Sequence, residues 1–157
     1  MKQLAGICVL AMLAISSMAE GGELAVRKPR VLLAWEKTRF KSALIEEMER
    51  ELKARGCDVV KARHTSKGLD ARAADYDAVF ITNSGVRSKV RPWIVEWLAA
   101  NKAEAARILL HTTQTSGWKV DVSVDAVTSA SSKSDVKSLA AEYVARIEKI
   151  LKPGGGE

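Results

Sequence analysis

The chain is poor in cysteine, histidine and aromatic residues, and each scarcity limits what it can do. Its two cysteines are Cys8 and Cys57, and its two histidines, His64 and His111, have no His or Cys partner at ligand spacing. The sequence therefore gives little support to a metal site. Aromatic residues make up 5% of the chain. This low content, with basic residues interleaved among acids, disfavours nucleic-acid binding.

Long hydrophobic runs are also missing. The longest apolar segment, Leu4 to Ile15, has about a dozen residues, whereas a membrane-spanning helix needs roughly 20. Lys2 precedes this run and the small residues Ser17 and Ala19 follow it, which is the layout of a secretory signal. We predict a signal peptide over residues 1–19 and an exported mature chain, periplasmic or secreted. The alternative interpretation of this apolar segment is a membrane anchor.

Cleavage after residue 19 would remove Cys8, so the mature chain would have one thiol and no intrachain disulfide. The length that remains is typical of one domain. We expect a flexible leader over 20–29, a folded domain over 30–151 and a flexible tail over 152–157. The net charge of +6 favours anionic partners, although a soluble, solvated surface is the simpler explanation.

Hydrophobic patterning predicts alternating strands and helices between the leader and the tail. The predicted strands are Val31–Trp35, Cys57–Ala62, Ala78–Thr82, Arg107–His111 and Val120–Val124. The predicted helices are Phe40–Arg55, Pro92–Lys102 and Val136–Leu151, and Ser132 is the expected cap of the last one. One crossover helix is shortened or lost.

This alternation favours an α/β domain, a three-layer, doubly wound parallel sheet of five strands in the order 2-1-3-4-5. The first and last helices should cover one face and the Pro92 helix the other. Ligands of such sheets bind at the carboxyl ends of the strands. The loops of interest are therefore 36–42, 83–90, 112–119 and 128–134.

Three stretches resemble the flavodoxin family in their order of elements. They are Arg30 to Val60, Tyr76 to Ile81 followed by Asn83, Ser84 and Gly85, and Leu109 to Trp118. The resemblance implies a flavodoxin-like fold, bound FMN, electron transfer and a redox partner protein.

The resemblance also implies where the flavin phosphate would lie, in the turn after the first strand. Of the family's hydroxyl, Thr and Gly positions only Thr38 matches, and Glu36 would repel a phosphate. Candidate replacements are the charged and hydroxyl groups of Lys37, Arg39, Lys41 and Ser42 at a helix N-terminus. The alternative is an ordinary solvated, charged helix start.

The flavin ring would lie against the loops after the third and fourth strands. The residues that the resemblance assigns to it are Asn83, Ser84, Gly85, Thr112, Thr113 and Trp118. Trp118 would stack on the ring, or else act as a lid over the edge of the core.

Two functions remain open from the sequence. One is an exported flavodoxin-like domain that binds FMN and transfers electrons. The other is a flavin-free periplasmic binding or interaction module on the same fold. No catalytic residue is assigned, because a hydrolase reading lacks a credible nucleophile.

Overall fold

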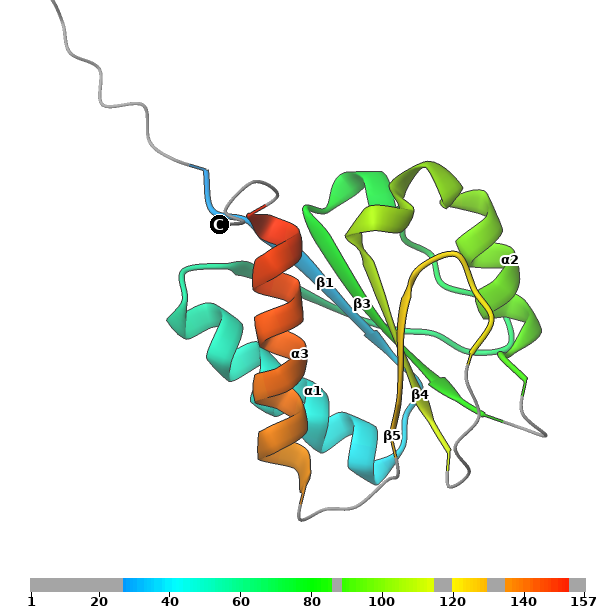
Figure 1. The fold of residues 1–157 in the computed structure, drawn as a ribbon, viewed down its shortest axis with the longest axis horizontal. Coiled ribbons are helices and arrows are strands. Elements are labelled where there is room, and N and C mark those ends of the chain that lie inside the picture. The colour runs from blue at the N-terminus through cyan, green and yellow to red at the C-terminus, as the bar shows by residue number, and fades with distance from the viewer. Residues whose placement is uncertain (1–26, 86–88, 115–119, 130–134, 153–157) are drawn as a thin grey trace, which may run out of the picture.

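The computed structural model describes residues 27–85, 89–114, 120–129 and 135–152 (Figure 1). Its strands are β1 (Arg30–Trp35), β2 (Asp58–Arg63), β3 (Ala78–Ser84), β4 (Ile108–Thr113) and β5 (Asp125–Ser129). Its helices are α1 (Arg39–Ala54), α2 (Pro92–Ala100) and α3 (Val136–Leu151), with short 3₁₀ turns η1 (Ala73–Asp75) and η2 (Lys102–Arg107). The predicted signal peptide, most of the leader, most of the tail, and Ser132 lie outside the described residues.

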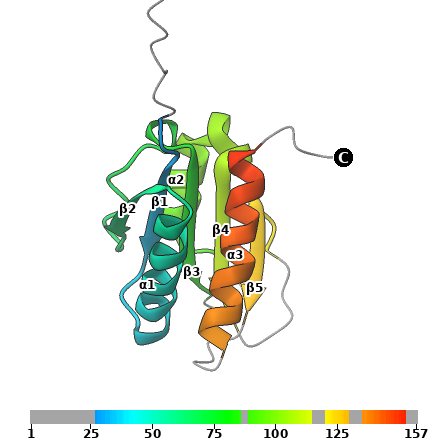
Figure 2. The same ribbon diagram turned by 90° about the vertical axis from the view of Figure 1, so that its left-hand side faces the viewer.

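The five strands form one sheet in the order β2-β1-β3-β4-β5, and every neighbouring pair is parallel. The predicted strand order is confirmed. Helices α1 and α3 lie side by side on one face of the sheet, and α2 covers the other, so the domain has three layers (Figures 1 and 2). The ends of β1 and β3, where the strand order reverses, are neighbours in this arrangement.

Alternate residues of the strands build a separate apolar core on each face, as the period of two in a strand requires. From β1, Val31 and Leu33 pack with α1 and α3, whereas Leu32 and Ala34 pack with α2. The runs are apolar throughout because the central strands are covered on both faces.

Local signals fix both ends of α1. The Thr38 side chain accepts a hydrogen bond from the Lys41 amide at 3.2 Å and caps the first turn. Gly56 adopts φ = 82°, a left-handed conformation, just past the last turn. The Cys57 amide then donates to the Leu52 carbonyl, which closes the C-terminal cap that the sequence predicted at Gly56.

The fifth strand lies later in the chain than predicted. The ladder to β4 begins with Leu109 opposite Asp125, so 120–124 is a connecting segment and not the strand. Val120 is buried, and Val122 and Val124 are partly buried, in the α2-side core. One-sided packing of this connecting segment therefore produced the alternation from which the sequence predicted a strand.

The strands β3 and β4 run on beyond the predicted ends, to Ser84 and Thr113. The connection from β2 to β3 contains only the 3₁₀ turn η1, which agrees with the expected loss of a crossover helix. No helix among the described residues is long and apolar enough to cross a membrane.

Candidate functional site

The central strands change from apolar to polar along their length. β3 reads Ala-Val-Phe-Ile and then Thr-Asn-Ser, and β4 reads Ile-Leu-Leu and then His-Thr-Thr. Because parallel strands all end at one edge of the sheet, the polar residues collect at the carboxyl edge. The buried polar side chains of the described residues all lie in this half of the molecule: Lys41, His64, Thr82, Asn83, His111 and Thr112.

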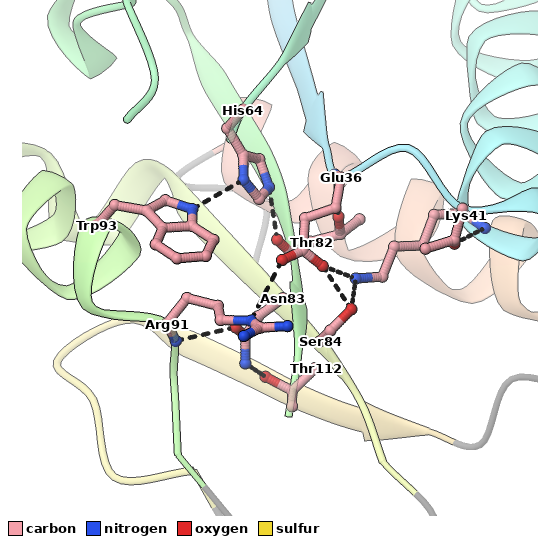
Figure 3. Close-up of polar contacts among 10 residues, drawn as sticks. Glu36, Lys41, His64, Thr82, Asn83, Ser84, Arg91, Trp93 and Thr112 are labelled. Carbon is pink, nitrogen blue, oxygen red and sulfur yellow. Dashed lines mark hydrogen bonds and ion pairs between the residues drawn. The ribbon is translucent and has the colours of Figure 1, made fainter. Parts of the chain in front are cut away.

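A charged cluster occupies the end of β1 next to β3 (Figure 3). The Glu36 carboxylate accepts hydrogen bonds from Lys41 Nζ and Ser84 Oγ through the same oxygen, Oε2, each at 2.5 Å. Lys41 Nζ also donates to Ser84 Oγ at 2.7 Å. The other carboxylate oxygen of Glu36, Oε1, lies 3.6 Å from Nε of Arg91. The Glu36 carboxylate therefore accepts hydrogen bonds from an ammonium and a hydroxyl, and forms a longer ion pair with a guanidinium.

Burial makes this cluster electrostatically strong. The Lys41 side chain is 1% exposed and the Glu36 side chain 14%. Burial opposes ionisation of Glu36, but the bonds from Lys41 and Ser84 and the charge of Lys41 outweigh it and hold its pKa below the ordinary value. Burial lowers the pKa of Lys41, and its contacts with Glu36 offset this only in part. The Lys41 ammonium therefore forms a buried ion pair with the Glu36 carboxylate.

A second set of hydrogen bonds ties the start of α2 to the ends of β3 and β4. The Asn83 side chain accepts from the Arg91 amide at 3.1 Å and donates to Thr112 Oγ1 at 3.2 Å. The Arg91 guanidinium lies over the ring of Trp93, 5.4 Å from its centroid. The position of Arg91 is therefore fixed by contacts of both its amide and its guanidinium, and its Nε faces Glu36.

His64 is held on both ring nitrogens and is 2% exposed. Its Nε2 lies 2.8 Å from the Thr82 carbonyl, which only accepts, so Nε2 carries the proton. Its Nδ1 accepts from the indole N–H of Trp93 at 3.2 Å. This arrangement requires the neutral ring. Burial lowers the His64 pKa, and the raising effects of Glu36 and of the Thr82 carbonyl do not cancel that.

His111, on β4, lies inside the α1 and α3 side of the core and is fully buried. Its ring stacks on Phe80 at 6.1 Å and lies 5.1 Å from the ring of Tyr143, and its Nε2 is 2.8 Å from Ser129 Oγ. Burial, with a smaller effect of the Lys41 charge, lowers the His111 pKa to about 3.

The structure separates the predicted phosphate residues into two groups. Lys37, Thr38 and Arg39 are exposed at the start of α1, with the Thr38 hydroxyl used as the helix cap. Lys41 is buried against Glu36 and Ser84, and the Ser42 amide donates to the Thr38 carbonyl. The sequence offered Lys41 as a candidate ligand of the phosphate, whereas in the structure its ammonium faces the Glu36 carboxylate.

The predicted ring residues are brought together only in part. Asn83 and Thr112 hydrogen-bond directly, and the Gly85 amide donates to the Thr113 carbonyl at 3.1 Å. A Cβ at Gly85 would lie 2.2 Å from the Gln114 side chain, so glycine permits this close approach. Trp118 lies outside the described residues.

Arg91 and the Trp93–His64 contact were missed by the sequence analysis. Arg91 directly precedes the Pro that opens α2, a position one residue outside the loop we singled out. Among the described parts of the chain, no three His, Cys, Asp or Glu side chains gather closely enough to hold a metal ion.

Comparison with solved structures agrees with this architecture. An archaeal flavodoxin matches with a TM-score of 0.52 and 11% identity, covering 78% of this chain and 99% of its own. Oxidised flavodoxin 1 from Bacillus cereus matches with a TM-score of 0.54 and 8% identity, covering 78% of this chain and 99% of its own. No protein-family model and no curated protein sequence matches the chain. The chain has the flavodoxin-like fold, and identities this low carry nothing beyond the fold.

Proposed function

We propose that this chain is an exported, flavin-free binding module on the flavodoxin-like fold. The observation that carries the proposal is the Glu36 carboxylate, which accepts from Lys41 and Ser84 in the turn after β1. This turn is where the flavodoxin resemblance would put a phosphate. An anion of the protein itself thus takes up the donors that a bound anion would need.

Electrostatics argue against a phosphate beside this carboxylate. Two like unit charges about 4 Å apart repel by roughly 4 kcal/mol near a protein surface. A charge-assisted hydrogen bond to the phosphate would contribute about 1.5 to 3 kcal/mol of favourable free energy. Lys41 contributes little to an external anion, because Glu36 already neutralises it. The residues of this turn therefore do not fit a dianionic phosphate.

The second candidate is the FMN-binding, electron-transferring protein of the resemblance. It is favoured by Lys37 and Arg39, which are exposed at the start of α1 and would approach an anion from the solvent side. Its redox partner would be another protein. The two candidates differ in one measurable property, the affinity for FMN.

Titration of FMN with the purified protein tests the proposal, with flavin fluorescence as the signal. We expect micromolar wild-type protein to leave the fluorescence unchanged. Glu36→Gln removes the repelling carboxylate and frees Lys41, so this variant should bind FMN more tightly than the wild type does. Glu46→Gln is the matched control, because it removes the same charge from an exposed position of α1.

Wild-type protein that quenches FMN but not riboflavin, which lacks the phosphate, would overturn the proposal in favour of the electron-transfer candidate. The export half of the proposal rests on the N-terminal sequence. N-terminal sequencing of protein recovered outside the cytoplasm should begin at Glu20, whereas an intact Met1 chain in the membrane fraction would contradict export.

A further inference from the structure

The carboxyl ends of three neighbouring strands, β2, β1 and β3, carry an excess of positive charge. The segment 36–41 follows β1, and the segments 63–68 and 84–91 begin at the last residues of β2 and β3. Their described residues contain one acid, Glu36, and seven bases: Lys37, Arg39, Lys41, Arg63, Lys67, Lys89 and Arg91. Glu36 already pairs with Lys41 and Arg91.

Five of these bases form what we call the basic rim: Lys37, Arg39, Arg63, Lys67 and Lys89. All five are exposed, and none forms an ion pair within the described ranges. Arg63 lies over the ring of Trp35 at 5.7 Å, which orients it without neutralising it. The rim therefore presents uncompensated charge from three adjacent strand ends.

At the opposite edge, the amino edge of the sheet, basic and acidic residues are more nearly balanced. The segments before the first four strands, 27–29, 55–57, 69–77 and 101–107, contain six bases and four acids. Two of the acids are paired there, Asp77 with Arg27 and Glu104 with Arg107. The start of β1 and the end of α3, near which the described chain begins and ends, also lie at this edge (Figure 1). Neither end covers the basic rim.

We propose that the basic rim docks on the anionic headgroups of a phospholipid surface. Three of its five members are lysines, a residue depleted at protein–protein interfaces but suited to diffuse attraction by a charged membrane. The one exposed large hydrophobic side chain of the described residues is Val95, on α2 and outside the rim. Docking by the described residues of the rim is therefore electrostatic.

This inference rests on the proposed role as a binding module, and it names the partner. The two can fail separately, because vesicle binding and FMN binding are measured independently. Absence of vesicle binding would leave the flavin-free proposal standing. FMN binding would overturn that proposal whatever the vesicles show.

The test is cosedimentation of the mature chain with vesicles of phosphatidylcholine containing phosphatidylglycerol. The wild type should bind these and not vesicles of phosphatidylcholine alone. Raising the ionic strength from about 0.1 M to about 1 M shortens the Debye length from about 10 Å to about 3 Å and should release the protein. The triple variant Lys37→Gln, Lys67→Gln, Lys89→Gln should bind roughly 100-fold more weakly.

The matched control is Lys28→Gln, Lys102→Gln, Lys152→Gln, which removes the same charge from exposed lysines at the opposite edge. The six residues of β1 put about 20 Å between the edges, beyond the Debye length, so this control should bind within about threefold of the wild type. Equal losses in both triple variants would overturn the proposal, because net charge alone would then explain binding. Binding to poly-L-glutamate but not to the vesicles would also overturn it and assign the rim to an acidic protein.

Discussion

The two edges of the sheet use polar residues in different ways. At the carboxyl edge, Lys41, His64 and Asn83 are buried and linked by hydrogen bonds to neighbouring strands. At the amino edge, charged side chains pair at the surface, as Arg27 does with Asp77, and the Arg27 side chain is 70% exposed. Buried charges need partners and exposed ones do not. Substitutions of polar residues should therefore cost more stability at the carboxyl edge than at the amino edge.

The acid response of His111 should be the largest effect of this difference. The His111 pKa is lowered to about 3 from 6.5, so the unfolded chain binds more protons than the folded chain between these values. The associated stability is present above pH 6.5 and is lost as the pH falls toward 3, by about 5 kcal/mol at most. His111→Gln keeps a polar group near Ser129 and removes the titration. Urea unfolding at several pH values should show a shallower loss in this variant.

His64 provides a comparison for that experiment. Burial lowers its pKa too, so His64→Gln should also reduce the loss of stability in acid. If neither variant changed the pH dependence of the free energy of unfolding, acid sensitivity would not come from the buried histidines of the carboxyl half.

Removing one partner of the buried ion pair should have the next largest effect. Lys41→Met leaves Glu36 with only Ser84 and the more distant Arg91, and should cost about 3 kcal/mol of unfolding free energy. Glu36→Gln with Lys41→Met should recover part of it. Arg27→Met at the amino edge breaks an exposed pair and should stay close to the wild type. Chemical denaturation measures the unfolding free energy of all three variants. Equal losses for Lys41→Met and Arg27→Met would contradict the difference between the two edges.

The smallest effect concerns two tryptophans of α2. Trp93 hydrogen-bonds to the carboxyl half of the domain, and Trp97 hydrogen-bonds to the amino half. Trp93 donates to His64 and Trp97 donates to the Ala71 carbonyl in the segment before β3. Trp93→Phe removes a bond that favours neutral His64, at a cost of about 1 kcal/mol. The His64 pKa should rise in Trp93→Phe and stay unchanged in Trp97→Phe. An NMR titration of the ring nitrogens decides this, and equal His64 pKa values in both variants would contradict the assigned tautomer.

The topology was predictable because it depends on runs of similar residues. Apolar runs at Val31 and Ala78 give strands covered on both faces, and the amphipathic segment ending at Gly56 gives α1. The position of β5 was not predictable in this way. Both stretches, 120–124 and 125–129, contribute partly buried hydrophobic residues, and only the ladder with β4 places the strand at 125–129.

The candidate site was predictable only in its location. Because ligands bind at the carboxyl ends of parallel strands, the sequence predicted a site at the turn after β1 and the end of β3. Both contribute residues to the observed cluster. The partners themselves were not predictable, because Glu36 and Ser84 are 48 positions apart and no local pattern links them. Sequence spacing also could not show whether Lys41 faces solvent or a carboxylate of its own chain. That difference separates a phosphate site from an internal ion pair.

The most direct measurement of the central claim is the visible absorption spectrum of the mature protein after incubation with excess FMN and gel filtration. Because the Glu36 carboxylate holds the donors that a phosphate would need, we predict a protein peak without flavin absorption. A protein peak that carries stoichiometric FMN would contradict the account.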